Sequence, residues 1–517
     1  MKIFSSSVVL LIGVLSFIVA PSPSHAQNPI ANGGLHHHYH VIQMPTLGGD
    51  ATAFPDATNN IAVINRRGEL TTASETSHHD PNAPFYWWNP TGNIAHAVVW
   101  LNGSMTDLGA LPGTNNSIGD WISDNGIVAG YSENGSIDPS VPDLPEISAV
   151  IWRNDQIVDL GTLPGGGYQS ATISVNNRGQ ATGVATNLVP DPNSLLQYNL
   201  TLWDIPYSYQ LRAFFWDEKT GMRDLGTLGT GTNAEAVRIN NYGEIIGNSY
   251  ISSAPGACNN QETGAFLWDR IHGMKNLGSF GGSCTLANDI NDRGQVVGGS
   301  LVSGDRYERA YLWQKDSFRD LGGSLGGQNT GALAINQNGI SVGFAYHRDE
   351  NTYHATLWIR PGEMIDLGSV GDDPCSFAQG INEAGQVVGD STPNDCQAFD
   401  VSRGFLWENG SIADLNALIL EPSQLYIRYA YAINARGEIA VNGVDHNGLE
   451  QAALLIPCDE NHPGVEGCDY SMTGAGGASS PPSASKPSMP GRSTVPPRPN
   501  RRLHLFSTGT RMEGVAR

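Results

Sequence analysis

Eight copies of one short motif constrain the fold of this chain more than any other feature. The consensus places a small residue and Ile before Asn-x-x-Gly, followed by Glu or Gln and two apolar residues. Seven copies have the Asn and the second has Ser, at positions Asn65, Ser123, Asn176, Asn240, Asn291, Asn336, Asn382 and Asn434. A repeat with this period is typical of an array or a propeller. The motif therefore predicts the fold, although it does not by itself predict a function.

Two further phrases accompany the motif and define the repeating unit. A Trp that ends a short apolar run is followed by a turn such as Asn102-Gly103 or Asn409-Gly410, and then by Asp-Leu-Gly. Asn-Gly between apolar runs favours a hairpin, because both central residues of that turn need a positive φ. Each repeat is thus predicted to form two hairpins, which is the four-stranded composition of a propeller blade.

The two ends of the repeat region complement each other. Residues 41–47 resemble a fourth strand with no blade before it, and residues 452–456 resemble a third strand with no fourth strand after it. Joining the two ends closes a ring and removes the exposed sheet edges. We therefore expect an all-β fold, a β-propeller of eight four-stranded blades closed by an N-terminal strand that completes the last blade. A seven-bladed ring with one eccentric unit is the alternative.

The length of the repeats varies mainly between the second and third strands, for example at residues 132–148, 185–211 and 249–263. In a meandering sheet these loops share one face with the links between blades, and we call it the variable face. The Asn-x-x-Gly and Asn-Gly turns lie on the opposite face, the turn face. Irregular loops on a rigid scaffold are the usual location of binding or catalysis.

The termini indicate an exported protein of 517 residues. Residues 1–26 have the basic start, the apolar stretch and the small-residue cleavage site of a signal peptide. No other segment approaches the roughly 20 apolar residues of a membrane span. We expect a propeller over residues 27–468, a disordered Pro-, Ser- and Gly-rich basic tail over residues 469–517, a secreted or periplasmic location, and a monomer.

Six cysteines suit an oxidising compartment. Cys284 and Cys375 each precede a repeat Asn by seven residues, and we place them in the links between blades on the variable face. Cys258 and Cys396 lie in long loops between second and third strands, on the same face. The predicted disulfides are Cys258–Cys284, Cys375–Cys396 and Cys458–Cys468; six cysteines allow 15 connectivities, and metal binding is the alternative use.

Charge excludes one large class of partner. The whole chain has a net charge of −22, and residues 27–468 contain 20 basic and 48 acidic residues, a net charge of −28. Such a surface will not bind nucleic acid.

Most of the residues that could support chemistry have a structural interpretation. The histidine run at residues 36–40 could collect a metal ion, but structural sites space their ligands around a fixed turn, so we assign no metal site and no cofactor. The repeated Asp of Asp-Leu-Gly lies once per blade, which favours turn capping over a catalytic pair. The repeated Trp is predicted to pack between blades. No common hydrolase or nucleotide motif occurs, and we assign no catalytic residues.

Aromatic residues outside the repeat are the best ligand-binding candidates. They occupy the first and third long loops, where Tyr198 and Tyr209 also lie, and the candidates are Tyr86, Trp87, Trp88, Trp203 and Tyr207. Exposed rings are suited to stacking on sugars or to anchoring a protein. Alternatively, these loops fold over and bury their own aromatic rings.

With these phrases in place, the chain resembles the HAF repeat family of extracellular repeat proteins, named for His-Ala-Phe in the third strand. The similarity covers residues 41–456, with stretches such as Arg212-Ala213-Phe214-Phe215-Trp216, although the literal His-Ala-Phe never occurs. The resemblance implies bacterial export and a repetitive β fold, without an activity. We expect an exported binding or scaffold module whose variable face contacts a glycan, a cell wall or a protein. The alternative is an enzyme acting on an extracellular polysaccharide.

Overall fold

Short, mainly antiparallel β-strands are the dominant secondary structure of the described residues. The computed structural model describes residues 35–54, 62–81, 91–139, 145–154, 156–191, 209–258, 261–394, 396, 401–420, 423–466 and 468–474. The predicted signal peptide and most of the predicted tail lie outside these residues. In the described part of the chain the α-helical structure is the single turn α1 (Leu415–Leu418), capped by the Asp414 side chain, which accepts a hydrogen bond from the Asn416 amide.

Strand pairing arranges the described strands into four-stranded antiparallel units, each in simple chain order. The first four units are β3 (Gly48–Ala53), β4 (Leu70–His79), β5 (Asn93–Leu101) and β6 (Ser104–Asp107); β7 (Ser117–Ile122), β8 (Val128–Ile137), β9 (Pro145–Arg153) and β10 (Gln156–Asp159); β11 (Ser170–Val175), β12 (Ala181–Pro190), β13 (Tyr209–Asp217) and β14 (Gly221–Asp224); β15 (Ala234–Ile239), β16 (Ile245–Tyr250), β17 (Thr263–Asp269) and β18 (Gly273–Asn276).

The remaining units continue the same order, except that the last takes its outer strand from the N-terminal region. They are β19 (Gly281–Ile290), β20 (Val296–Val302), β21 (Glu308–Gln314) and β22 (Ser317–Asp320); β23 (Gly326–Ile335), β24 (Ser341–His347), β25 (Tyr353–Arg360) and β26 (Glu363–Gly368); β27 (Cys375–Ile381), β28 (Val387–Thr392), β29 (Arg403–Glu408) and β30 (Ser411–Asp414); β31 (Tyr426–Ile433), β32 (Ile439–Val444), β33 (Glu450–Pro457) and β2 (Tyr39–Gln43).

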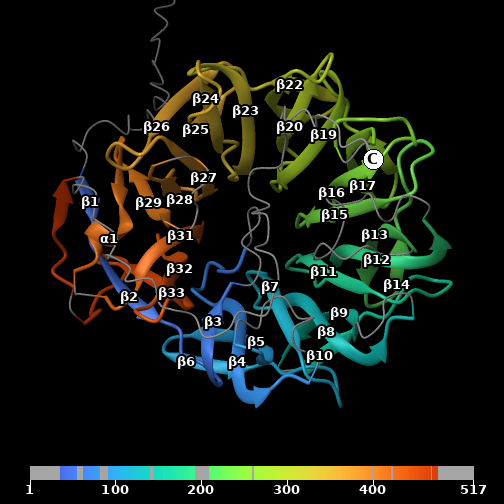
Figure 1. Ribbon diagram of the computed structural model, residues 1–517, viewed down its shortest axis with the longest axis horizontal. Coiled ribbons are helices and arrows are strands. Elements are labelled where there is room, and N and C mark those ends of the chain that lie inside the picture. Colours follow the sequence, from blue (N-terminus) through green and yellow to red (C-terminus); the bar gives the residue numbers. More distant parts are fainter. Residues whose placement is uncertain are drawn as a thin grey trace, which may run out of the picture.

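The units follow one another around a central axis, with the first strand of each unit nearest to that axis (Figure 1). Neighbouring units touch through their first strands, and the eighth unit touches the first through a parallel bridge between Thr52 and Gln451. This arrangement is a β-propeller.

The N-terminal strand joins the last unit, as the complementary ends of the repeat predict. β2 pairs antiparallel with β33 from Tyr39 opposite Pro457 to Gln43 opposite Ala453 (Figure 1). Just before β2, β1 (Leu35–His37) pairs with β34 (Met472–Gly474). Ordered structure thus extends to Gly474, into the first residues of the segment expected to be a tail.

The repeated Trp side chains are buried in the sheet interfaces, in agreement with their predicted packing role. All seven are at most 7% exposed, and Leu455 takes this position in the eighth unit. Phe215 of the third unit stacks on Trp268 of the fourth, with ring centroids 5.4 Å apart. Apolar side chains therefore fill the space between neighbouring units.

The predicted turns have the backbone geometry that their residues require. The Gly of all eight Asn-x-x-Gly turns has a φ between 67° and 86°. Asn102 and Gly103 both have positive φ, as do Asn409 and Gly410, which is the expected hairpin geometry.

The Asn of each intact motif bonds both to its own turn and to the next unit. In Asn336, Oδ1 accepts hydrogen bonds from the amides of Asn338 and Ile340, both at 3.0 Å, while Nδ2 donates to the Asn382 carbonyl oxygen at 3.0 Å. All seven repeat asparagines make these three bonds, and the last step runs from Asn434 to the Asn65 carbonyl, from the eighth unit back to the first. We call this set the asparagine ring.

One step of the ring is different because Ser123 has no amide to donate. The Ser123 hydroxyl accepts from the Ile127 amide, but a serine cannot reach the next unit in the same way. Instead, Trp121 Nε1 donates to the Val175 carbonyl oxygen at 3.0 Å, and Asn125 Nδ2 donates to the Asn177 carbonyl oxygen at 2.6 Å. Neighbouring side chains thus supply the missing link between the second and third units.

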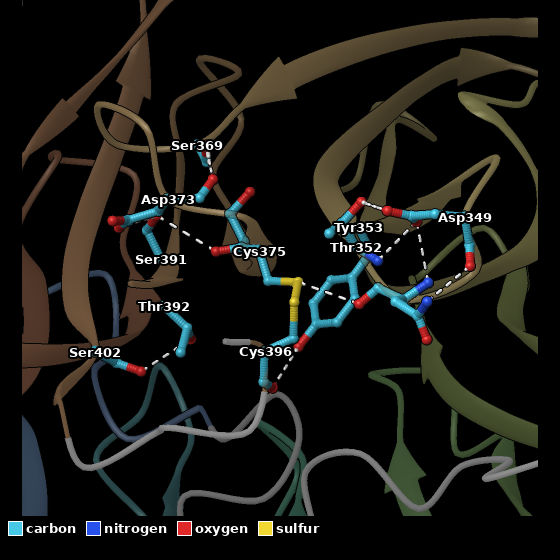
Figure 2. Close-up of a disulfide and its surroundings, with 12 residues drawn as sticks. Asp349, Thr352, Tyr353, Ser369, Asp373, Cys375, Ser391, Thr392, Cys396 and Ser402 are labelled. Carbon is cyan, nitrogen blue, oxygen red and sulfur yellow. Dashed lines mark hydrogen bonds between the residues drawn. A yellow bond between two sulfur atoms is a disulfide. The ribbon is translucent and has the colours of Figure 1, made fainter. Parts of the chain in front are cut away.

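Three disulfides connect the cysteines in the predicted pairs. Cys284 and Cys375 lie in first strands, at the parallel bridges between neighbouring units, rather than in the links where the sequence placed them. Cys258–Cys284 joins the fourth unit to the fifth. Cys375–Cys396 lies within the seventh unit, where Tyr353 of the sixth unit donates its hydroxyl hydrogen to the Cys396 carbonyl oxygen (Figure 2).

Replacing a ring asparagine should destabilise the propeller through the unpaired groups that it leaves. We expect Asn336→Ala to lower the free energy of unfolding by about 1–3 kcal/mol for each buried group left without a partner. Asn336→Ser retains the acceptor found naturally at Ser123, so it should cost less. Urea unfolding of both variants measures the difference, and equal losses would contradict a stabilising role for the bonds that the side chain accepts.

Candidate functional site

The repeated carboxylates of the fourth strands have local structural partners. Asp107, for example, accepts from the Gly109 amide at 2.8 Å and contacts the His96 ring at 3.0 Å. The same amide contact recurs two residues after each of the corresponding side chains, which are Asp159, Asp224, Asn276, Asp320, Asp366 and Asp414. These contacts support the turn-capping interpretation.

Basic residues of the third strand pair with four of these carboxylates. The pairs are His96 with Asp107, Arg212 with Asp224, Arg309 with Asp320, and His354 with Asp366, at 3.0–3.1 Å. The fourth unit has no such pair, because Gly264 replaces the basic residue and the uncharged Asn276 replaces the aspartate. Burial alone would raise the pKa of Asp107, but the hydrogen bonds from His96 and Gly109 outweigh it and lower that pKa. These four carboxylates are therefore separate ion pairs, whereas Asp414 of the seventh unit shares the buried Arg403 with Asp373, at 3.9 Å and 2.9 Å.

The axial channel contains a second set of side chains, on the first strands. A β-bulge interrupts seven of these strands just before the motif, including those that carry Trp121, Arg238 and Asp289. The Arg238 guanidinium lies 4.7 Å from the centre of the Trp121 ring and 4.0 Å from Asp289. Burial lowers the pKa of Arg238 to about 10, although Asp289 opposes this shift.

A cavity of about 270 Å³ opens beside these residues at the turn-face end of the channel. Trp121 and Asp289 line one side of it, and Ala334, Gly380 and Ala432 line the other. The side chains at its rim are already used between units: Asn241, for example, accepts from the Asn177 amide and donates to Asp292. We interpret this end of the channel as structural.

The predicted ligand-binding aromatics Tyr86, Trp87, Trp88, Trp203 and Tyr207 lie outside the described residues. In the sequence they belong to the connections from β4 to β5 and from β12 to β13. The structure therefore leaves these five predictions untested, but it describes the strands on either side.

Three second strands, β4, β8 and β12, continue beyond their units on the variable face. Each has ten residues with the same pattern, six buried residues, one half-buried and then three exposed. The second strands of the other five units have six or seven residues. The first three units therefore carry the longest hairpins, which raise this part of the variable face.

Two tyrosines meet between the raised hairpins of the second and third units. Tyr168 lies in the link before β11, and Tyr209 is the first residue of β13; their ring centroids are 5.2 Å apart, with 53° between the ring planes. Both rings are half-buried. Exposed aliphatic side chains lie at the ends of the neighbouring strands, at Ile137, Leu188 and Val189. Aromatic and aliphatic surface is thus concentrated at this position.

Polar side chains surround the tyrosine pair. Glu146 accepts from Asn134 Nδ2 at 3.2 Å, and buried Asp138 accepts from Gln169 Nε2 at 2.9 Å. Both carboxylates are close enough to Tyr168 to interact with it electrostatically. Burial raises the pKa of Glu146; the Asn134 hydrogen bond opposes this shift, and the charge of Asp138 adds to it.

A carboxamide pair extends the polar surface along the third unit. Asn187 Nδ2 donates to Gln210 Oε1 at 3.1 Å, between β12 and β13. The tyrosine pair, Glu146, Asp138, Asn187 and Gln210 are together called the tyrosine site. This site combines rings with hydrogen-bonding groups on the hairpins of the second and third units, so its geometry is held by the propeller.

Sequence reasoning found part of this site. Tyr209 was recognised among the aromatics of the third loop, whereas Tyr168, Glu146 and Asp138 were missed. Tyr168 follows three glycines in a link between units, so no repeated phrase marks it. Asp138 directly follows the long strand β8, as buried Asp80 follows β4 and buried Asp191 follows β12, and a comparison of these three connections would have marked it.

Comparisons with known proteins give the fold only. No family model matches the chain. No curated protein matches it. Similar solved structures include an acylaminoacyl peptidase of Pyrococcus horikoshii, with 10% sequence identity over 64% of this chain and 49% of that chain and a TM-score of 0.37. The β-propeller domain of the Trilobed protease from Pyrococcus furiosus has 8% identity over 69% of this chain and 97% of that chain, with a TM-score of 0.35. Trypanosoma rangeli sialidase has 7% identity over 81% of this chain and 59% of that chain, with a TM-score of 0.29.

A buried carboxyl group outside the tyrosine site gives a direct test of packing between units. Glu308 is 3% exposed and takes the position of Leu211 in the third unit; its Oε1 has no hydrogen-bond partner and lies over Gly299. Burial raises its pKa well above the usual range. The folded protein therefore keeps a proton that the unfolded chain releases.

Removing this carboxyl group should stabilise the protein in a pH-dependent manner. Because the folded pKa is raised, the wild-type protein loses stability as the pH rises above the unfolded value. We expect Glu308→Gln to raise the free energy of unfolding by about 1–3 kcal/mol at pH 8 and to have little effect at pH 4. Urea unfolding at both pH values measures this, and a difference independent of pH would contradict the assignment.

Proposed function

We propose that the protein is an exported binding module of the HAF repeat type that holds an extracellular glycan at the tyrosine site. The observation that carries this proposal is the Tyr168–Tyr209 pair, flanked by carboxylates and carboxamides on the raised hairpins of two neighbouring units. Sugars present apolar C–H faces and hydroxyl groups, so they need aromatic surface and polar partners at one place.

The rest of the molecule is consistent with an exported scaffold. The three disulfides suit an oxidising compartment. No helix in the described part of the chain is long and apolar enough to cross a bilayer. Because the asparagine ring and the fourth-strand ion pairs occupy most repeated polar groups, the repeat supplies the scaffold and the irregular hairpins supply the contacts.

The loop aromatics extend the same proposal. Residues 82–90 and 192–208 connect the strands of the first and third raised hairpins, on either side of the second unit. Tyr86, Trp87, Trp88, Trp203 and Tyr207 therefore belong to connections that begin and end at the same raised surface. We propose that they enlarge the glycan contact.

An enzyme acting on a polysaccharide is the less favoured alternative. The repeated carboxylates lie at most once per unit, and four of them form separate ion pairs, which does not favour a catalytic pair. Turnover of a bound glycan would be needed to support the alternative.

The test is a glycan array and a bacterial cell-wall pulldown with the mature wild-type chain and with Tyr209→Ala. We expect the variant to bind about tenfold more weakly or worse, because truncating a central aromatic contact removes much of the binding energy. Tyr242→Ala is the matched control, since Tyr242 is a tyrosine on the turn face and is 72% exposed.

Two outcomes would overturn the proposal. Absence of glycan and cell-wall binding by the wild-type chain would leave a protein partner as the better hypothesis. Equal binding losses in Tyr209→Ala and Tyr242→Ala would show that the tyrosine site is not the contact.

A further inference from the structure

The first and last described segments of the chain meet at the turn face of the seventh and eighth units, where they bring together histidines and carboxylates. β2 completes the eighth unit, β1 pairs with β34, and the Cys458 amide donates to the His38 carbonyl oxygen at 2.8 Å. The strand that closes the propeller is therefore flanked on both sides by the histidine-rich contacts described next.

Glu408 forms the first of these contacts, in the seventh unit. It is buried and accepts from the His37 amide at 2.9 Å, while the His37 ring lies 3.2 Å away. The buried His36 ring has Nδ1 3.7 Å from the same carboxylate and Nε2 2.9 Å from the Ser411 hydroxyl. β1 is thus held to the end of β29 by one carboxylate.

Glu438 forms the second contact, in the eighth unit. It is buried and lies 3.3 Å from His462 Nε2, and His462 Nδ1 lies 2.7 Å from Asp459. Arg436 also faces Glu438, at 3.3 Å. His462 belongs to the segment that follows β33 and is closed by the Cys458–Cys468 disulfide.

Both carboxylates are directly connected to the asparagine ring. Glu438 accepts from Asn434 Nδ2, which also donates to the Asn65 carbonyl oxygen. Glu408 accepts from Gln386 Nε2, and Gln386 accepts from Asn382, which donates to the Asn434 carbonyl oxygen. The histidine contacts therefore meet the ring at the two junctions of the eighth unit.

We propose that the His37–Glu408 and His462–Glu438 contacts form a pH-sensitive clasp that keeps β2 in the eighth unit at weakly acidic pH and loosens it at alkaline pH. Loosening exposes the edge of β33 and uncouples the chain ends from the ring. No other part of the asparagine ring is joined to histidine among the described residues.

The direction of the effect follows from the pKa shifts. The Glu408 hydrogen bond raises the pKa of His37 against the effect of burial. Burial opposes a charged His462, but Glu438 and Asp459 outweigh it and raise that pKa. The stabilisation from these two histidine contacts is complete below the pKa of histidine in the unfolded chain. It disappears as the pH rises through the raised pKa values of His37 and His462 in the folded protein.

Acidic pH weakens the clasp for a different reason. Burial would raise the pKa of Glu408, but hydrogen bonds and charge from His37 outweigh it and lower that pKa. The pKa of Glu438 is lowered in the same way by His462 and Asn434. The stabilisation that these two carboxylates contribute is therefore lost when acid protonates them. Burial lowers the pKa of His36, which therefore resists the charge that acid would give it. His38, which faces Asp469, buried Tyr39, and His40 of β2 itself are the other ionisable groups at this strand. The clasp is therefore strongest at pH values between the pKa of a carboxyl group and the pKa of a histidine in the unfolded chain.

The test is backbone hydrogen exchange of β2 in the intact mature protein from pH 6 to pH 9, corrected for the intrinsic rate at each pH. We expect protection of residues 39–43 to fall several-fold over this range, while β19 and β20 keep theirs. In the double variant with His37→Gln and His462→Gln, protection of β2 should already be low at pH 6 and change little with pH.

His272→Gln is the matched control, because His272 pairs with Asp269 at 2.8 Å at an exposed hairpin tip and should leave the profile unchanged. Protection of β2 that does not depend on pH in the wild-type protein would overturn the proposal, whether or not the double variant folds. A pH profile that the double variant retains would also overturn it.

Discussion

The structure depends on a side-chain amide that bonds in two directions. Each ring asparagine accepts two amides of its own turn through Oδ1 and donates through Nδ2 to the carbonyl of the next unit. A single residue therefore shapes the inner turn and links it to its neighbour. Because the last link returns from Asn434 to Asn65, the same bond closes the ring through which the first and eighth units meet. Apolar packing supplies most of the driving force, and this bond gives the packing its direction.

Function is associated with the departures from this symmetry. The second strands of the first three units extend past the scaffold, and the tyrosine site lies between two of them. The chain ends add histidines that no other unit has at this place. The repeated groups have partners inside the scaffold, whereas the irregular ones pair with groups outside the repeat pattern, at the raised hairpins and beside β1. On the two proposals above, one rigid fold combines a contact surface with a pH-sensitive closure.

Much of the scaffold was predictable from the sequence because its signals are local and repeated. The four-strand unit follows from turn residues at fixed spacing, and the cysteine pairs follow from their positions within that unit. The second bond of each asparagine was not predictable, since it depends on the carbonyl of a residue 45 or more positions away. The role of the histidine run was missed for the same reason, because Glu408 is 371 residues from His37. Tyr168 was missed since its partner Tyr209 is distant in the sequence and no repeated spacing links the two.

Hydrogen exchange of the eight inner turns in the native protein tests the central claim most directly. In the seven asparagine turns, the amide two residues after the Asn donates to its side chain, whereas the Ser123 hydroxyl accepts only the amide four residues on. The account predicts slow exchange of the amides of Arg67, Arg178, Tyr242, Arg293, Asn338, Ala384 and Arg436, and faster exchange of Asn125. Exchange of all eight amides as fast as the exposed hairpin amide of Gly103 would contradict the asparagine ring.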